Sequence, residues 1–346
     1  MELSESFLSS HAELHPQHIE ISSDNDAIYK TEQLDTCLKL ISKGQSLPFT
    51  VLNNRVGYRQ NDNARMLLDA IRYLDMIQKE YLEMRTVNPR IAVFQRLLND
   101  SNLSYRIVDG KIAGTDQVTT AEMLNKLTQD YRHATNASEF KQEYRKHKRA
   151  SVKNLKGVQN YIRHLQSRHA RLLVLRVDLS WASEYASDIT ANMAREHRQK
   201  LFLDMKKNPI FRHVLGTVWK LEYGPYRKFH YHVLFFLNGD KAQQDVNIAR
   251  AFGECWKTTI TAGKGIYYNC NAHKERYDKC GLGKVHRDDA TAQEGLLRAV
   301  RYITKIDACA RLLLPDNART FGRGEIKSLK ARKRKPSRRN QPDTPI

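Results

Sequence analysis

The sequence predicts an α+β protein in which an α-helical region precedes a central antiparallel sheet with helices on one face. Three observations indicate this class. Apolar residues recur at helical spacing through much of the first 165 residues, and strand-like apolar runs begin after Ala170. Segments with helical spacing lie between and after those runs. The resulting order of one strand, a helix, two strands and further helices is typical of a sheet packed against helices.

The expected elements divide the chain into four parts. Residues 1–25 are polar and are predicted to be disordered, 26–165 form the helical accessory region, 166–325 form the sheet domain, and 326–346 form a basic disordered tail. The helices expected in the accessory region are 31–44, 64–84, 91–99 and 120–161. The strands expected in the sheet domain are 172–179, 215–223 and 229–237, and its helices are 186–206, 245–259 and 292–313, with a polar loop or ragged strand over 267–287.

The charge of the chain indicates a polyanionic partner. The 346 residues include 58 Lys and Arg against 38 Asp and Glu, which gives a formal net charge of +20. Nucleic acid is the commonest partner of so basic a protein. The alternative is a soluble protein with a solvated basic surface.

Cysteine usage and hydropathy indicate the compartment. The five cysteines are irregularly spaced, with no C-x-x-C, as expected for thiols in a reducing environment. The polar N-terminus does not resemble a signal peptide, and no apolar run reaches the ~20 residues that a membrane span needs. We therefore expect a cytoplasmic protein with no membrane partner.

Two histidines lie in the most strand-like segment of the chain. His230 and His232 are two residues apart, so they point to the same face of the strand 229–237. If this strand forms a hairpin with 215–223, Glu222 lies opposite the histidines. Two imidazoles and one carboxylate suit a divalent cation, Mg²⁺ or Mn²⁺, with open positions for water and phosphate. The alternative is a chance pair of surface or core histidines. Asp178, on the first strand, is expected near the same place.

The last predicted helix carries a tyrosine and a lysine three residues apart. Tyr302 and Lys305 lie together beside the apolar stripe of that helix. A tyrosine hydroxyl is a poor nucleophile because its pKa is near 10, but an ammonium group and a metal-polarised phosphate make its attack feasible. The alternative is an ordinary amphipathic helix with a boundary tyrosine and a solvated lysine.

Three further motifs are candidates for a functional role. Cys270, His273, Cys280 and His286 have no standard zinc-finger spacing, which favours a loop with free thiols. The pair Tyr267-Tyr268 lacks a lysine at the required offset, which favours base stacking or core packing. The segment Phe321-Gly322-Arg323-Gly324 is predicted to be a tight turn that presents Arg323.

Taken together, these motifs resemble a known family. A strand with a glutamate, a His-x-His strand and a helix with Tyr-x-x-Lys follow in the order of the HUH endonucleases that initiate rolling-circle replication. The segments 224–239, 302–307 and 319–324 are similar to the replication-protein family of inoviruses, which includes the YagK/YfjJ C-terminal domain of bacterial prophages. The resemblance covers roughly 165–325. Tyr231 departs from it, since the name HUH implies a bulky aliphatic residue between the histidines.

The resemblance implies a fold, an activity and roles for the candidate residues. The fold would be a Rep-like domain with an RRM-like core. His230, His232 and Glu222 would bind the metal, Tyr302 would form a 5′-phosphotyrosine intermediate, and Lys305 would steady the phosphate or the tyrosinate. The residues Arg323, Lys220 and Arg301 would contact DNA.

The implied activity is metal-dependent nicking and rejoining of a single-stranded or hairpin origin. The sequence has no G-x-x-x-x-G-K-[ST] motif, so a host helicase would supply unwinding. Plasmid mobilisation and transposition by relaxases and transposases use the same chemistry. The alternatives are a non-catalytic DNA-binding protein or regulator of a prophage, and a metal-dependent hydrolase that uses activated water.

Overall fold

The computed structural model describes most of the chain. It describes residues 16–52, 57–77, 85–114, 116–224, 226–305, 310–314 and 318–325. The predicted basic tail, 326–346, therefore lies outside the described residues, as does 1–15 of the predicted disordered N-terminus. The remainder of that N-terminal segment belongs to helix α1, which begins at Pro16.

The N-terminal half is a helical region with its own apolar core. Its helices are α1 (Pro16–Lys43), α2 (Asp62–Met76), α4 (Pro89–Asp100), α5 (Gln117–Asn136) and the 3₁₀ turn η1 (Ser104–Arg106). Its short strands are β1 (Phe49–Val51), β2 (Tyr58–Gln60), β3 (Arg85–Val87), β4 (Ile107–Val108) and β5 (Lys111–Ile112). Apolar residues at helical spacing, such as Leu34, Leu38 and Ile41, meet in one core. The predicted helical accessory region is thus helical with small hairpins added.

The C-terminal half is built on a six-stranded antiparallel sheet. Its strands are β6 (Arg171–Trp181), β7 (Val214–Gly224), β8 (Lys228–Asn238), β9 (Gly265–Asn269), β10 (Gly283–His286) and β12 (Phe321–Arg323). The order across the sheet is β10-β6-β8-β7-β12, and β9 also pairs with β6. The three predicted strands are therefore the three long central ones. The segment 267–287, predicted as a loop or ragged strand, supplies β9 and β10.

Strands β9 and β10 share one edge of β6, and a side chain fills the gap between them. β10 pairs with residues 171–174 of β6 and β9 pairs with residues 177–181. Between them, the Asn271 side chain accepts a hydrogen bond from the backbone N–H of Arg176 (2.9 Å) and donates one to the carbonyl of Val174 (3.0 Å). These bonds satisfy buried backbone groups that no strand reaches.

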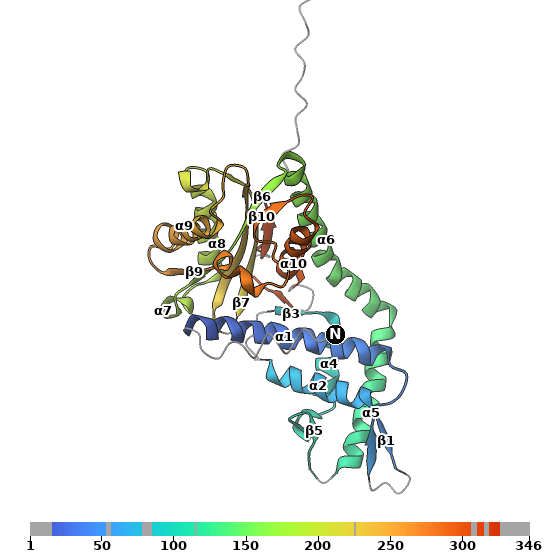
Figure 1. Ribbon diagram of the computed structural model, residues 1–346. Helices are drawn as coiled ribbons and strands as arrows, with labels where there is room; N and C mark the ends of the chain where they lie inside the picture. The colour runs from blue at the N-terminus through green and yellow to red at the C-terminus, as the bar shows by residue number, and fades with distance from the viewer. Residues whose placement is uncertain are drawn as a thin grey trace, which may run out of the picture.

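Helices cover both faces of this sheet, which corrects the prediction of helices on one face (Figure 1). The helices of this half are α6 (Ser138–Arg168), α7 (Ser183–Ala186), α8 (Ala191–Asp204), η2 (Pro209–Phe211), α9 (Asp245–Cys255), the π-helical turn η3 (Trp256–Ile260), η4 (Cys270–Arg276) and α10 (Ala290–Lys305). Apolar residues of α8, α9 and η3 pack on one face. Those of α6 and α10 pack on the other. The prediction failed because periodicity shows that a helix is amphipathic but not which face of a sheet it covers.

The chain after α10 returns to the helical region. The predicted helix 292–313 ends at Lys305, and strand β11 (Ala310–Leu312) follows and pairs antiparallel with β3. The Arg85 guanidinium of β3 also donates a hydrogen bond to the carbonyl oxygen of Tyr223 at the end of β7. The helical region is thereby attached to the sheet close to the β7–β8 turn.

The segment predicted as a tight turn at 321–324 is instead an edge strand. β12 pairs antiparallel with β7, and Arg323 lies opposite Val218. Glycine is required there by close approach rather than by a turn. A Cβ on Gly322 would lie 2.6 Å from the Trp219 ring, and a Cβ on Gly324 would lie 2.1 Å from the Tyr161 hydroxyl oxygen. No helix in the described ranges is long and apolar enough to cross a membrane.

Candidate metal centre

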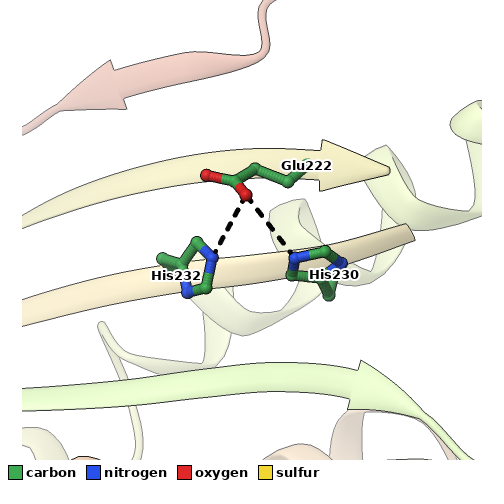
Figure 2. A group of neighbouring side chains, drawn as sticks. All are labelled: Glu222, His230 and His232. Atoms are coloured by element: carbon green, nitrogen blue, oxygen red, sulfur yellow. Dashed lines mark ion pairs between the residues drawn. The ribbon is translucent and has the colours of Figure 1, made fainter. Parts of the chain in front are cut away.

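The hairpin of β7 and β8 brings the three predicted ligands together. In its register Glu222 lies opposite His230, and Lys220 lies opposite His232. Because side chains alternate along a strand, Glu222 and both histidines project from the same face. Figure 2 shows the Glu222 carboxylate on one strand reaching across to both imidazoles on the next.

The donor atoms are close enough to share one cation. One carboxylate oxygen of Glu222, Oε2, lies 3.6 Å from His230 Nε2 and 3.4 Å from His232 Nε2. One donor atom from each residue lies within 4.8 Å of the other two, and all three residues are buried. Donors about 2.1 Å from a common ion and about 90° apart would lie about 3 Å from one another. The residues therefore fit a divalent cation with little rearrangement.

A second set of hydrogen bonds orients both imidazoles. His230 Nδ1 lies 3.1 Å from the carbonyl oxygen of Lys228, and His232 Nδ1 lies 2.8 Å from Asp178 Oδ1. When each Nδ1–H donates to these oxygens, each Nε2 keeps a lone pair that faces Glu222. Metal-binding histidines are held in this way.

Glu222 carries an unsatisfied acceptor. Its second carboxylate oxygen, Oε1, is buried and has no hydrogen-bond partner among the described residues. Buried polar atoms are nearly always partnered, so such an atom calls for an explanation. A cation bound by the two histidines and by both carboxylate oxygens of Glu222 would supply one.

Arg176, which the sequence pattern did not predict as a site residue, lies beside Asp178 and His232. Its guanidinium forms a two-point ion pair with Asp178, with Nε–Oδ1 of 3.0 Å and Nη2–Oδ2 of 3.1 Å. Its Nη2 also lies 3.2 Å from His232 Nδ1. A signal was available, since Arg-x-Asp in an apolar strand puts two charges on one face. The expectation that Asp178 lies near the site is confirmed.

Tyr302 lies over this cluster. Helix α10 places its ring edge-on to the His232 imidazole, with 5.8 Å between ring centroids. The Arg176 guanidinium carbon lies 4.9 Å from the centroid of the same tyrosine ring, within range of a cation–π interaction. The helix therefore brings the predicted nucleophile to the predicted metal ligands. Lys305 ends α10, and its side chain lies outside the described residues.

Burial and neighbouring charges set the protonation of the site. Burial alone would raise the pKa of Glu222, but the two histidines hold it well below its usual range. Burial likewise opposes charge on His232, yet Asp178 and Glu222 raise its pKa. Burial and the charge of Arg227 lower the pKa of His230. Without a metal, these shifts favour the ionised form of Glu222, the protonated form of His232 and the neutral form of His230, each relative to the free side chain.

The same factors act on the tyrosine. Burial and the charge of Glu222 raise the pKa of Tyr302, and Arg176 opposes them only in part. A cation held by Glu222 would remove the negative charge that disfavours the tyrosinate.

The residues predicted to contact DNA occupy different environments. Arg323 and Arg301 are exposed. Lys220 is buried, only 1% exposed, and its Nζ lies 3.5 Å from the Thr320 hydroxyl. The position of Lys220 therefore does not support the predicted DNA contact, because its strand alternation places it on the covered face beside His232.

The remaining candidates do not form a second centre. Within the described ranges, Glu222, His230 and His232 are the one group that could hold a metal, so Cys270, His273, Cys280 and His286 are not gathered. Tyr267 donates a hydrogen bond to Glu254 (2.8 Å), and burial raises its pKa to about 12. The Tyr268 ring stacks on the His273 imidazole, with 5.3 Å between centroids.

Comparison with known proteins identifies the family. No curated protein and no solved structure matches the chain significantly. The family model of the YagK/YfjJ C-terminal domain matches residues 133–324, which include α6, the whole sheet and α10. This match covers more than half of the chain, and the protein therefore belongs to the YagK/YfjJ C-terminal domain family.

Proposed function

We propose that the protein is a metal-dependent endonuclease of the HUH type that nicks and rejoins single-stranded DNA through Tyr302. The observation that carries the proposal is the edge-on packing of the Tyr302 ring against the His232 imidazole, with 5.8 Å between ring centroids. His232 is one of three residues suited to a divalent cation. Two weak sequence patterns, His-x-His and Tyr-x-x-Lys, are far apart in the chain but adjacent in space. Chance patterns would not be expected to meet at one buried cluster.

The proposed reaction is a transesterification that needs no co-reactant. The Tyr302 hydroxyl oxygen bonds to the phosphorus of the scissile phosphodiester, and the bond from phosphorus to the 3′-oxygen breaks. The products are a 5′-phosphotyrosine link and a 3′-hydroxyl, which gains the proton that the tyrosine loses. Attack by a 3′-hydroxyl on the phosphotyrosine reverses these changes and rejoins a strand. Because one phosphate ester is exchanged for another, the phosphotyrosine bond retains the free energy needed to rejoin the strand.

The side chains have distinct roles in this scheme. His230, His232 and Glu222 would hold Mg²⁺ or Mn²⁺, which as a Lewis acid stabilises negative charge on the phosphate. Asp178 and Lys228 hold the imidazoles in the tautomer that exposes Nε2. Arg176 orients the Tyr302 ring and neutralises Asp178. Arg301 and Arg323, which are both exposed, would contact DNA phosphates.

The substrate would be a single-stranded or hairpin origin of a phage or prophage, in rolling-circle replication. The formal net charge of +20 favours such a polyanion. Because the three ligands are at most 3% exposed, a phosphate would reach them only after a movement of the elements that cover them. A host helicase in the cytoplasm would supply the unwinding that follows nicking.

A covalent adduct tests the proposal directly. The protein is incubated with a pool of 5′- or 3′-labelled single-stranded oligonucleotides and Mn²⁺, and adducts are resolved on a denaturing gel. We expect an adduct that carries the DNA segment 3′ to the nick, that EDTA prevents, and that Tyr302→Phe abolishes. Tyr267→Phe is the matched control and should keep the adduct.

Other outcomes identify other functions. Cleavage without an adduct, unchanged in Tyr302→Phe, would indicate a hydrolase that uses water. Metal-independent binding without cleavage of any pool member would overturn the proposal in favour of a non-catalytic DNA-binding protein.

A further inference from the structure

Helix α6 carries a concentration of positive charge that the proposed metal centre does not use. From Lys141 to Arg163 the helix has eight Lys and Arg and a single acidic residue, Glu143. We call these eight residues the α6 stripe. They are Lys141, Arg145, Lys146, Lys148, Arg149, Lys153, Lys156 and Arg163.

The stripe lies on one side of the helix. At about 100° per residue, its members fall within a sector roughly 160° wide. The residues of α6 that pack on the sheet, among them Val158 and Leu165, lie in the opposite sector. Glu143 lies outside the stripe sector. The cations are thus segregated from both the acidic residue and the packed face.

The members of the stripe face solvent and are not neutralised nearby. All eight are exposed, and none forms an ion pair with another described residue. Eight like charges along one helix repel each other, since like charges at i,i+4 destabilise a helix. An anionic partner would remove that cost.

The stripe leads from the helical region to the sheet. Arg163 lies 22 positions after Lys141, which is about 33 Å along the helix at 1.5 Å per residue. This length is close to one turn of duplex DNA, about 34 Å. Figure 1 shows α6 running from the helical region to the sheet along one side of the molecule.

Arg323 adjoins the sheet end of the stripe. A Cβ on Gly157 of α6 would lie 3.4 Å from Arg323 Nε, and the Arg323 guanidinium lies 5.6 Å from the centroid of the Tyr161 ring. Arg323 is paired with Val218 on β7, four residues before Glu222, on the face that carries the metal ligands. At about 3.3 Å per residue, this places the end of the stripe about 13 Å along the strand from the centre.

We infer that the α6 stripe, extended by Arg323, binds the phosphate backbone of about one turn of double-stranded DNA beside the nicking site. The identification of the polyanion as DNA rests on the proposed function. The duplex form follows from the stripe itself. Sites for single strands combine cations with exposed aromatic rings that stack on bases, and the stripe sector contains no Phe, Tyr or Trp. A phosphate contact by helix side chains needs no base readout, so the binding is independent of sequence.

The test compares two variants with the same change in charge. In the stripe variant Arg145, Arg149, Lys153 and Lys156 are replaced by Gln, which has a similar helix propensity. In the control variant Lys206, Lys207, Lys241 and Lys257 are replaced by Gln. These four are also exposed, but they belong to or adjoin α8, α9 and η3 on the opposite face of the sheet.

Binding is measured by fluorescence anisotropy with a labelled 20-base-pair duplex of arbitrary sequence over a range of KCl. EDTA and the Tyr302→Phe background remove metal binding and cleavage, so failure of the proposed function leaves this test intact. Circular dichroism confirms that both variants are folded. Each phosphate contact contributes about 0.9 to the slope of log K against log salt.

We expect the magnitude of that slope to be smaller by about 3 to 4 in the stripe variant. We also expect its duplex affinity to be at least about tenfold lower at ~0.1 M salt. The control variant should change both much less, and a single strand of equal length should respond less than the duplex. Equal losses in both variants would overturn the inference, because they would reflect net charge alone. A larger loss for the single strand would overturn the assignment to duplex DNA.

Discussion

The two faces of β8 differ in what burial does to them. On one face Phe229, Tyr231, Val233, Phe235 and Leu237 pack in an apolar core with α8 and α9. On the other face His230 and His232 are as deeply buried, but among charged groups. Burial stabilises the first face by removing apolar surface from water, and it destabilises the second by removing hydration from polar groups. Packing of the apolar face therefore supplies the stability that keeps the polar side chains of the other face in position.

The largest expected effect is a loss of stability on substitution in the apolar face. Phe235 is 1% exposed, and its ring contacts that of Phe252, with 4.9 Å between centroids. We expect Phe235→Ala to lower the free energy of unfolding by about 3–5 kcal/mol, through lost burial and the cavity left behind. Urea denaturation measures this change. The folded fraction should still bind Mn²⁺, and a loss of binding larger than the loss of folded protein would contradict the separation of the two faces.

The reverse experiment damages the polar face. Glu222→Gln keeps the shape of the side chain but removes the charge that a cation needs. We expect Mn²⁺ affinity to fall at least about 100-fold in isothermal titration. The metal-free protein should also lose some stability near neutral pH, because the pKa of Glu222 is lowered in the folded protein and its charge is paired there with the histidines. Wild-type protein should gain about 2.7 kcal/mol of stability at a Mn²⁺ concentration 100 times the dissociation constant, and the variant should not. Equal metal stabilisation of both proteins would exclude Glu222 as a ligand.

A smaller effect on metal affinity is expected from Asp178, which contacts His232 on the side away from Glu222. Asp178→Asn keeps a hydrogen-bond acceptor for His232 but removes the charge, and it leaves Arg176 without its ion pair. Loss of such a partner of a metal-binding histidine typically costs 10–100-fold in metal affinity. Titration with Mn²⁺ measures this, and Asp240→Asn, at an exposed position, is the control. An unchanged affinity would show that Asp178 does not position His232 for a metal.

The pH dependence has opposite signs with and without metal. The pKa of His232 is raised in the folded protein, so its imidazolium stabilises the metal-free fold below about pH 6.5, and that contribution is lost as pH rises through the folded pKa. A cation competes with the same proton, so its affinity increases as pH rises through that pKa. The gain in melting temperature on adding Mn²⁺ should therefore be larger at pH 8 than at pH 6. A constant gain would contradict competition at His232.

Strand alternation was enough to predict the polar face, but not what surrounds it. The period of two placed Glu222, His230 and His232 together, because register in a short hairpin follows from the turn. Arg176 was not predicted because the charges in the run 171–181 do not change its strand pattern, and the contact of Arg176 with Tyr302 depends on the fold. The second layer of helices, the edge strands β9 and β10, and the return of β11 to β3 depend on contacts between distant residues. Local periodicity contains no information about those contacts.

The smallest effect concerns the turn that orients His230. Lys228 has a φ of +51°, in the left-handed region, and its carbonyl oxygen faces His230 Nδ1. Lys228→Gly should keep this conformation and change the free energy of unfolding by no more than about 1 kcal/mol, with Mn²⁺ affinity nearly unchanged. Lys228→Val is the matched variant, because a β-branched residue resists positive φ and would move the carbonyl. Its metal affinity should fall further than that of the glycine variant. If both variants bind Mn²⁺ alike, the strained turn contributes nothing to the polar face, and the hydrogen bond from His230 is incidental.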